Sequence, residues 1–212
     1  MGQVALTSLD VASSGYNRWV AVWGLGMVGN LAAQAFQITG NRVIGIDPSA
    51  HRRQLALDCG VAHAIGGSPS ETLEQIRDIT GGLGAHITID AVGHCSIARH
   101  CIEATASHGE FIMLGSPRTS VEGDWMEILG AAHFRWVTVK GALEWRVPAV
   151  HQLENQHSQL KKHEALMAWI GDGRLKIAPL VSHLLSPAQI QIAYEGLLNH
   201  KNEFVGVVLN WK

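Results

Sequence analysis

The chain of 212 residues has few of the features that mark membrane, secreted or nucleic-acid-binding proteins. No apolar run approaches the ~18 residues that a membrane span requires, and residues 1–10 have neither a basic segment nor the long apolar core of a secretion signal. The three cysteines, Cys59, Cys95 and Cys101, are too few for a disulfide framework and suit a reducing cytoplasm. The net charge is −2, and the 16 Lys and Arg residues form no basic stripe. We therefore expect a cytoplasmic protein with no membrane and no nucleic-acid partner.

Patterns for metal-dependent and nucleophilic chemistry are also missing. The sequence contains no Gly-x-Ser-x-Gly nucleophile elbow. The strongest metal candidate combines His94 and Cys95 with His100 and Cys101, on one predicted helix. Residues six or seven apart on a helix lie roughly 9–10 Å apart along its axis, whereas zinc ligands lie about 2.0–2.3 Å from one ion. We therefore predict no metal at these four residues and no zinc in this chain.

What the sequence does contain is a glycine-rich turn between a predicted strand and a predicted helix. The apolar run Trp19–Trp23 leads into Gly24-x-Gly26-x-x-Gly29, and the helix Met27–Ile38 follows. In such a turn the first glycine allows a tight bend, the second lets a pyrophosphate approach the backbone, and the third lets the helix pack closely on the strand. The phosphates lie at the helix N-terminus, where unpaired N–H groups favour an anion. The triplet alone is weak evidence, because other strand-to-helix corners need glycine for packing.

A carboxylate follows at the spacing that dinucleotide binding requires. Arg42–Ile46 is a second apolar strand, and Asp47 comes directly after it. An acid about 20 residues beyond the glycine turn accepts a hydrogen bond from the ribose 2′-hydroxyl. Because a 2′-phosphate would face this carboxylate, Asp47 favours NAD over NADP. The alternative is that Asp47 caps a helix that begins near Pro48.

Strand-like and helical segments alternate from Trp19 to Gly141. The predicted strands are Trp19–Trp23, Arg42–Ile46, His63–Ile65, His86–Asp90, Glu110–Leu114 and Val137–Val139. The predicted helices between them are Met27–Ile38, Ala50–Asp58, Pro69–Thr80, Cys95–Thr105 and Trp125–Ala132. This alternation predicts an α/β Rossmann fold, a six-stranded doubly wound parallel sheet with helices on both faces.

The two ends of the chain have a different pattern. Val4–Ala12 has the composition of a short helix, and the tail contains predicted helices over Gln156–Ile170 and Ser186–Leu198 before a final strand, Val205–Asn210. The basic pairs Arg52-Arg53 and Lys161-Lys162 are interpreted as solvated helix ends.

Taken together, several segments resemble one family. They are Val20–Gly29, Val43–Asp47, Ile79–Ala85 leading into Asp90–Gly93, Gly109–Gly115, Val137–Gly141, Gly173–Leu180, Ser186–Leu198 and Val205–Leu209. This set resembles the medium-chain dehydrogenase/reductase superfamily, specifically its zinc-dependent alcohol, polyol and threonine dehydrogenase branch. The run Thr-Gly-Gly-x-Gly-Ala before Asp-Ala-Val-Gly is far more specific than the glycine triplet. The resemblance extends from about Ala5 to Trp211.

The resemblance implies a set of cofactor contacts at the ends of the central strands. They are Gly24, Gly26, Met27, Val28, Gly29, Asp47, Arg52, Ala91, Val92, Gly93, Leu114, Gly115 and Ser116. Arg52 occupies a position where this family often has a basic residue beside the adenosine ribose, although a solvated helix arginine explains it equally well. For Ala91–Gly93 and Leu114–Ser116 the alternative is an ordinary strand-to-helix turn.

The resemblance also implies what kind of protein this is. Relatives begin with a GroES-like domain that supplies the catalytic zinc ligands, but the chain has no Gly-His-Glu and no Cys-x-x-Cys. We therefore expect a linking helix over residues 1–15, an NAD-binding domain over 16–147, and a tail over 148–212 that in relatives returns to the catalytic domain. The N-terminal GroES-like domain is missing, so the chain is interpreted as the NAD-binding domain of an alcohol dehydrogenase-like oxidoreductase, inactive alone. A regulatory or sensory NAD-binding module and a dimerisation remnant remain as alternatives.

The last strand of the sheet suggests a partner. Val137–Gly141 should lie at the edge of the sheet, where an unpaired strand invites pairing with another chain. In the resembling family this strand pairs with its two-fold mate, which implies a homodimer with Trp136 or Trp145 partly buried in the contact. The alternative is a monomer in which Val205–Asn210 covers the edge.

Overall fold

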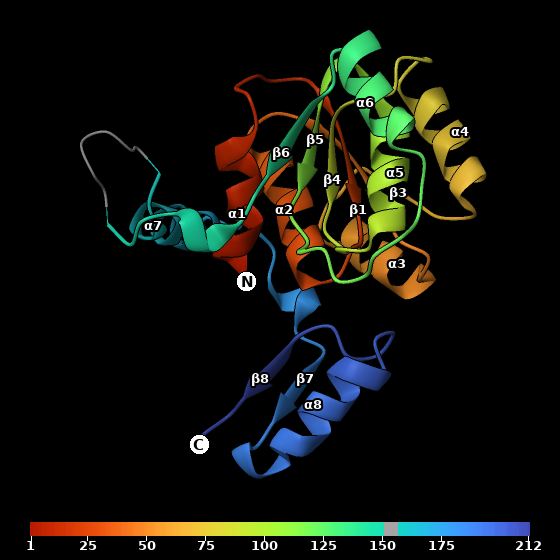
Figure 1. Cartoon of the computed structure of the whole chain (residues 1–212). Helices are drawn as coiled ribbons and strands as arrows, with labels where there is room; N and C mark the ends of the chain where they lie inside the picture. The colour runs from red at the N-terminus through yellow and green to blue at the C-terminus, as the bar shows by residue number, and fades with distance from the viewer. Residues whose placement is uncertain (151–156) are drawn as a thin grey trace.

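Six parallel strands form the centre of the molecule. The computed structural model describes residues 1–150 and 157–212, and its main sheet has the order β3-β2-β1-β4-β5-β6 (Figure 1). The strands are β1 (Trp19–Trp23), β2 (Arg42–Ile46), β3 (His63–Ile65), β4 (Ala85–Asp90), β5 (Thr105–Met113) and β6 (Thr138–Gly141). Because the strand order reverses beside β1, the sheet is doubly wound. The predicted fold class is confirmed.

Helices cover both faces of this sheet and enclose a core on each side. They are α1 (Gly2–Val11), α2 (Met27–Ile38), α3 (Ala50–Asp58), α4 (Pro69–Ile79), α5 (Cys95–Ala104), α6 (Trp125–Phe134) and α7 (Gln159–Gly171). Strand β1 shows how the cores are divided: Val20 and Val22 belong to the core cluster on the side of α1, α2 and α3, which α7 joins through its packing on α1, while Ala21 and Trp23 belong to the cluster on the side of α4, α5 and α6. None of the described helices is long and apolar enough to cross a membrane.

Most element boundaries follow the local signals in the sequence. Ser68 and Glu71 form a capping box at the start of α4, and Gly40 follows α2 with a φ of +84°, which a helix-terminating glycine adopts readily. Strand β5 is longer than predicted, because it begins at Thr105. Thr105 pairs with Ala85 of β4, and the register of the two strands shifts after this pair. The hydroxyl groups of Thr105 and Thr88 are also hydrogen-bonded to each other.

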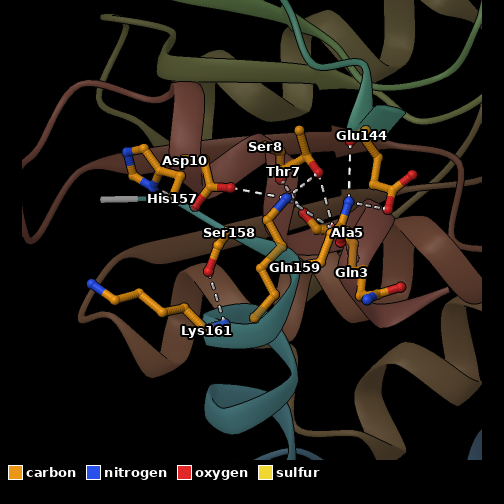
Figure 2. Close-up of polar contacts among 11 residues, drawn as sticks. Gln3, Ala5, Thr7, Ser8, Asp10, Glu144, His157, Ser158, Gln159 and Lys161 are labelled. Atoms are coloured by element: carbon orange, nitrogen blue, oxygen red, sulfur yellow. Dashed lines mark hydrogen bonds and ion pairs between the residues drawn. The ribbon is translucent and has the colours of Figure 1, made fainter. Parts of the chain in front are cut away.

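Helix α7 is held to α1 by a buried ion pair that the sequence does not predict. The Lys162 side chain is 3% exposed, its Nζ lies 2.9 Å from Asp10 Oδ2, and it donates a hydrogen bond to Thr7 Oγ1. On the other side of the same carboxylate, His157 Nδ1 lies 2.9 Å from Asp10 Oδ1 (Figure 2). The interpretation of Lys162 as a solvated helix end is wrong, because α7 packs this face against α1. The helix begins at Gln159, capped by Ser158, and the predicted start at Gln156 lies outside the described residues.

The last part of the chain forms a small unit that extends from the carboxyl ends of the strands (Figure 1). It contains β7 (His183–Leu185), α8 (Ile190–Asn199) and β8 (Val207–Leu209), and we call it the C-terminal unit. Strands β7 and β8 pair in parallel with each other. The monomer alternative required β8 to cover the edge of β6, but β8 pairs with β7 instead. Short 3-10 turns complete the chain: η1 (Glu144–Arg146), η2 (Ala178–Leu180) and η3 (Pro187–Gln189).

Candidate functional site

Two of the three glycines in the turn after β1 are required by the fold itself. Gly24 has a φ of +87°, and a Cβ placed on it would lie 2.7 Å from Cγ2 of Val92. A Cβ on Gly29 would overlap the carbonyl oxygen of Gly24. The tight turn therefore requires glycine at position 24, and the close approach of helix α2 requires it at position 29, as the sequence pattern predicted.

Gly26 is different, because nothing in the fold requires a glycine there. Its φ is −65°, which any residue adopts, and it is the N-cap of α2. Beyond its immediate neighbours, no heavy atom of the described chain lies within 4 Å of a Cβ placed on it. The first N–H groups of a helix have no partner within the helix. The structure thus leaves space in front of a helix N-terminus, where an anionic group can reach those donors.

Asp47 connects the second strand to the glycine turn. It is buried, its Oδ2 accepts the N–H of Leu25 at 2.8 Å, and its Oδ1 accepts the N–H of Ser49 at 2.8 Å. The residue that caps α3 is Ser49, whose side chain accepts from the N–H of Arg52, so Asp47 is not the cap of this helix. An ionised carboxylate offers about four acceptor positions, which leaves Asp47 able to accept further hydrogen bonds from hydroxyl groups.

Arg52 lies next to this carboxylate and is not a solvated helix arginine. Its side chain is 23% exposed, and its Nη1 lies 3.7 Å from Asp47 Oδ2. Its Nη2 donates to the carbonyl oxygen of Lys201 at 2.9 Å, and its Nε is buried without an acceptor among the described residues. The side chain therefore bridges the glycine-turn region and the C-terminal unit.

The two loops after β4 and β5 meet at the same edge of the sheet. Asp90, the last residue of β4, accepts the N–H groups of Val92 and Gly93 at 2.8 and 2.9 Å. Burial raises the pKa of the Asp90 carboxyl above its usual range, and these hydrogen bonds oppose the shift. The loop is thereby fixed beside the glycine turn, since Val92 lies against Gly24.

Glycines again allow the closest contact between these loops. Gly93 has a φ of +79°, and a Cβ on it would overlap the carbonyl of Ser116, while a Cβ on Gly115 would overlap the backbone nitrogen of Gly93. The N–H of Arg118 donates to the carbonyl of Gly93 at 3.0 Å. The structure therefore brings Ala91–Gly93 and Leu114–Ser116 together with the glycine turn, and their contact with a cofactor stays a prediction.

The described residues contain no group of three or more His, Cys, Asp or Glu that could hold a metal ion. His94 caps α5 through a hydrogen bond that its ring nitrogen accepts from the N–H of Ser96. Cys101 is buried on the core side of that helix, and Cys95 is exposed. Three of the four residues considered as a metal candidate, His94, Cys95 and Cys101, thus have separate surroundings.

The sequence did not indicate that the C-terminal unit contributes to this edge. The carbonyl of Lys201 meets Arg52, and Gly206 lies so close to the Met27 side chain that a Cβ on it would overlap the Met27 Cε. A backbone carbonyl carries no signal of residue type, and 149 residues separate Arg52 from Lys201. Only the folded chain reveals these contacts.

The doubly wound sheet, the glycine turn after β1 and the buried acid after β2 define a Rossmann-fold domain. More specifically, the chain belongs to the zinc-binding dehydrogenase family, whose sequence model matches residues 27–155.

Individual relatives agree with this assignment. An L-threonine 3-dehydrogenase of Caldanaerobacter subterraneus subsp. tengcongensis is 30% identical over 123 residues, which cover 58% of this chain and 35% of that protein. An L-threonine 3-dehydrogenase of Bacillus licheniformis is 23% identical over 210 residues, which cover 99% of this chain and 55% of that protein. The chain thus covers between about a third and about half of the length of these curated relatives.

Solved structures show the same fold. The 2R,3R-butanediol dehydrogenase of Bacillus subtilis matches with a TM-score of 0.79 at 19% identity, over 100% of this chain and 56% of that one. A short chain alcohol dehydrogenase of Escherichia coli CFT073, complexed with cofactor NADH, matches with a TM-score of 0.78 at 18% identity, over 99% of this chain and 57% of that one.

Proposed function

We propose that this chain is the NAD(H)-binding domain of a zinc-type, alcohol dehydrogenase-like oxidoreductase. The observation that carries the proposal is the open space beside Gly26, at the N-terminus of α2. At the other two glycines of the turn, other atoms of the chain occupy the corresponding space. This space lies beside the first N–H groups of the helix, which can donate hydrogen bonds to a pyrophosphate. The NADH in the E. coli CFT073 structure supports the choice of dinucleotide.

Each part of the site has a role in this proposal. The N-terminus of α2 holds the pyrophosphate, and Asp47 accepts hydrogen bonds from the ribose hydroxyl groups. Ala91–Gly93 and Leu114–Ser116 line the nicotinamide half at the carboxyl edge of the sheet. The bound nicotinamide supplies hydride transfer to or from a carbonyl or alcohol carbon.

We assign none of the family's zinc chemistry to the described residues. They offer no set of metal ligands, so no step of the reaction is assigned to a metal in this chain. We propose that the chain binds and orients the cofactor but does not oxidise alcohols by itself, and that residues 148–212 in part face a catalytic domain. In agreement with such a face, Leu184 in β7 is 64% exposed, although parallel strands are usually covered on both faces.

A regulatory NAD-binding module is the second candidate function. Turnover of an alcohol when a complementing catalytic domain is added would favour the oxidoreductase over this module.

The Asp47 carboxylate should make the chain prefer NAD to NADP. Isothermal titration calorimetry should show NAD binding in the micromolar to millimolar range and NADP binding at least about tenfold weaker, because a 2′-phosphate would lie against the Asp47 carboxylate. Asp47→Ala should reduce this preference. Asp58→Ala removes an exposed carboxylate at the far end of α3 and should leave the preference unchanged. Tighter binding of NADP, or no binding of either dinucleotide, would contradict the proposal.

We also propose that the chain forms a homodimer through β6. Among the described residues β6 pairs only with β5, so its outer edge is open. The one lysine of the strand does not protect that edge, because Lys140 Nζ lies 3.1 Å from Glu110 and donates to the carbonyl of Val11. Trp145, just beyond the strand, is 87% exposed. An uncharged open edge beside an exposed tryptophan suits pairing with a second copy.

Val139→Pro tests this interface with little harm to the fold. The N–H of Ala142 donates to Met113 of β5, and N–H groups alternate along a strand, so the N–H of Val139 points away from β5. Proline is tolerated at such an edge position. Light scattering should give a dimer for the wild type and a monomer for the variant. Lys140→Pro, whose N–H points inward by the same alternation, should instead destabilise the sheet. A monomeric wild type, or a dimeric Val139→Pro variant, would show that the interface is wrong.

A further inference from the structure

The Arg52 guanidinium lies between the proposed dinucleotide site and the C-terminal unit. One end, Nη1, is 3.7 Å from the Asp47 carboxylate, and the other end, Nη2, donates to the carbonyl of Lys201 at 2.9 Å. A guanidinium is planar and rigid, so its donors keep a fixed arrangement. Any group that fixes one end of this side chain therefore also orients the other.

The carbonyl of Lys201 belongs to the turn that joins α8 to β8. In this turn the N–H groups of Glu203 and Phe204 both donate to the carbonyl of His200 at 2.9 Å. Protection of these two amides from exchange therefore reports whether the turn is formed. The neighbouring Gly206 contacts Met27 of the glycine turn. The turn is thus attached at two points to the elements that would hold a dinucleotide.

The Nη1 end of Arg52 is the end that a bound ribose would meet. A ribose hydroxyl that donates to Asp47 Oδ2 would lie beside Nη1, which is 3.7 Å from that oxygen, and would present its own oxygen to Nη1 as an acceptor. Nη2 would remain free to hold Lys201.

We propose that Arg52 couples occupancy of the dinucleotide site to docking of the C-terminal unit. A bound ribose fixes the guanidinium in the orientation that holds the Lys201 carbonyl, so the dinucleotide strengthens the attachment of the turn. Coupling between two sites is reciprocal, so loss of the attachment weakens dinucleotide binding by the same factor. This inference rests on the proposed function, since it requires a dinucleotide at Asp47.

Hydrogen exchange of the whole chain, with and without saturating NAD, tests the coupling. NAD should slow exchange at Glu203 and Phe204 by about fivefold or more in the wild type. In Arg52→Ala this slowing should disappear, and NAD affinity should fall by a similar factor. Arg52→Lys keeps the charge without the fork and should behave like the alanine variant. Lys201→Ala is the matched control: it removes the side chain but keeps the carbonyl, so it should behave like the wild type.

The outcomes separate this inference from the proposed function. If the wild type binds no NAD in calorimetry, both fail. If NAD binds but exchange at the two amides does not change, or slows equally in Arg52→Ala, only the coupling is overturned. Unchanged exchange in α4, which lies on the opposite face of the sheet, shows that each variant is folded.

Discussion

Gly26→Val should abolish dinucleotide binding and leave the fold intact. Valine is compatible with the backbone of residue 26, and its Cβ has no heavy atom of the described chain within 4 Å beyond its immediate neighbours. A pyrophosphate must come within about 2.9 Å of the helix N–H groups to bond to them, and the valine methyl groups would occupy that position. We expect NAD affinity in calorimetry to fall by on the order of a hundredfold or more, while the loss of the glycine N-cap of α2 should lower the free energy of unfolding by only about 1 kcal/mol.

Gly29→Val provides the contrast. Its Cβ would overlap the carbonyl of Gly24, so this variant should lower the free energy of unfolding by more than about 2 kcal/mol, as overpacking of a tight contact does. The Gly29→Val variant would bind NAD more weakly because the turn that forms the site is disrupted. A Gly26→Val variant that bound NAD within threefold of the wild type would show that the open space does not hold the pyrophosphate.

Lys162→Ala should be among the most destabilising single substitutions in the chain. It leaves Asp10 in a partly buried position without its main counter-ion, and breaking a buried ion pair lowers the free energy of unfolding by about 3–5 kcal/mol. Urea denaturation should show this loss. Lys161→Ala, an exposed neighbour on the same helix, should change the free energy of unfolding by about 0.5 kcal/mol or less.

A double variant checks the cause of this loss. Asp10→Asn combined with Lys162→Met removes both charges and should recover much of the stability, because no uncompensated buried charge is left. We call the contacts of Lys162 with Asp10 and Thr7 the clamp between α1 and α7. If Lys162→Ala lowers the free energy of unfolding no more than Lys161→Ala does, the clamp contributes little to stability.

The parts of this structure that the sequence predicted are those determined by neighbouring residues. The bounds of β1 and α2 were predicted correctly because the apolar pattern, the glycines and the terminal Gly40 all lie within one short segment. The roles of Gly24 and Gly29 followed from the same pattern. The pattern did not show that Gly26 alone is free of structural constraint, because that depends on which atoms the folded chain places in front of it.

The features that could not be predicted depend on distant partners. Whether Lys162 is solvated or buried depends on Asp10 and Thr7, and whether Arg52 is solvated depends on a carbonyl in the C-terminal unit. Neither partner is marked by a local pattern. Without such a pattern a charged side chain is expected in solvent, and this expectation is wrong at Lys162, where α7 packs against α1.

The clamp between α1 and α7 also has a consequence for synthesis on the ribosome. Thr7 and Lys162 are 155 residues apart, so α1 is made long before the lysine that its polar side chains require. At about 5–20 residues per second, this delay lasts roughly 8–30 s. During that time α1 can pack only through its apolar side, where Ala5 and Leu6 share a core with α2. The polar contacts of α1 with α7 are therefore among the later ones to form on the nascent chain.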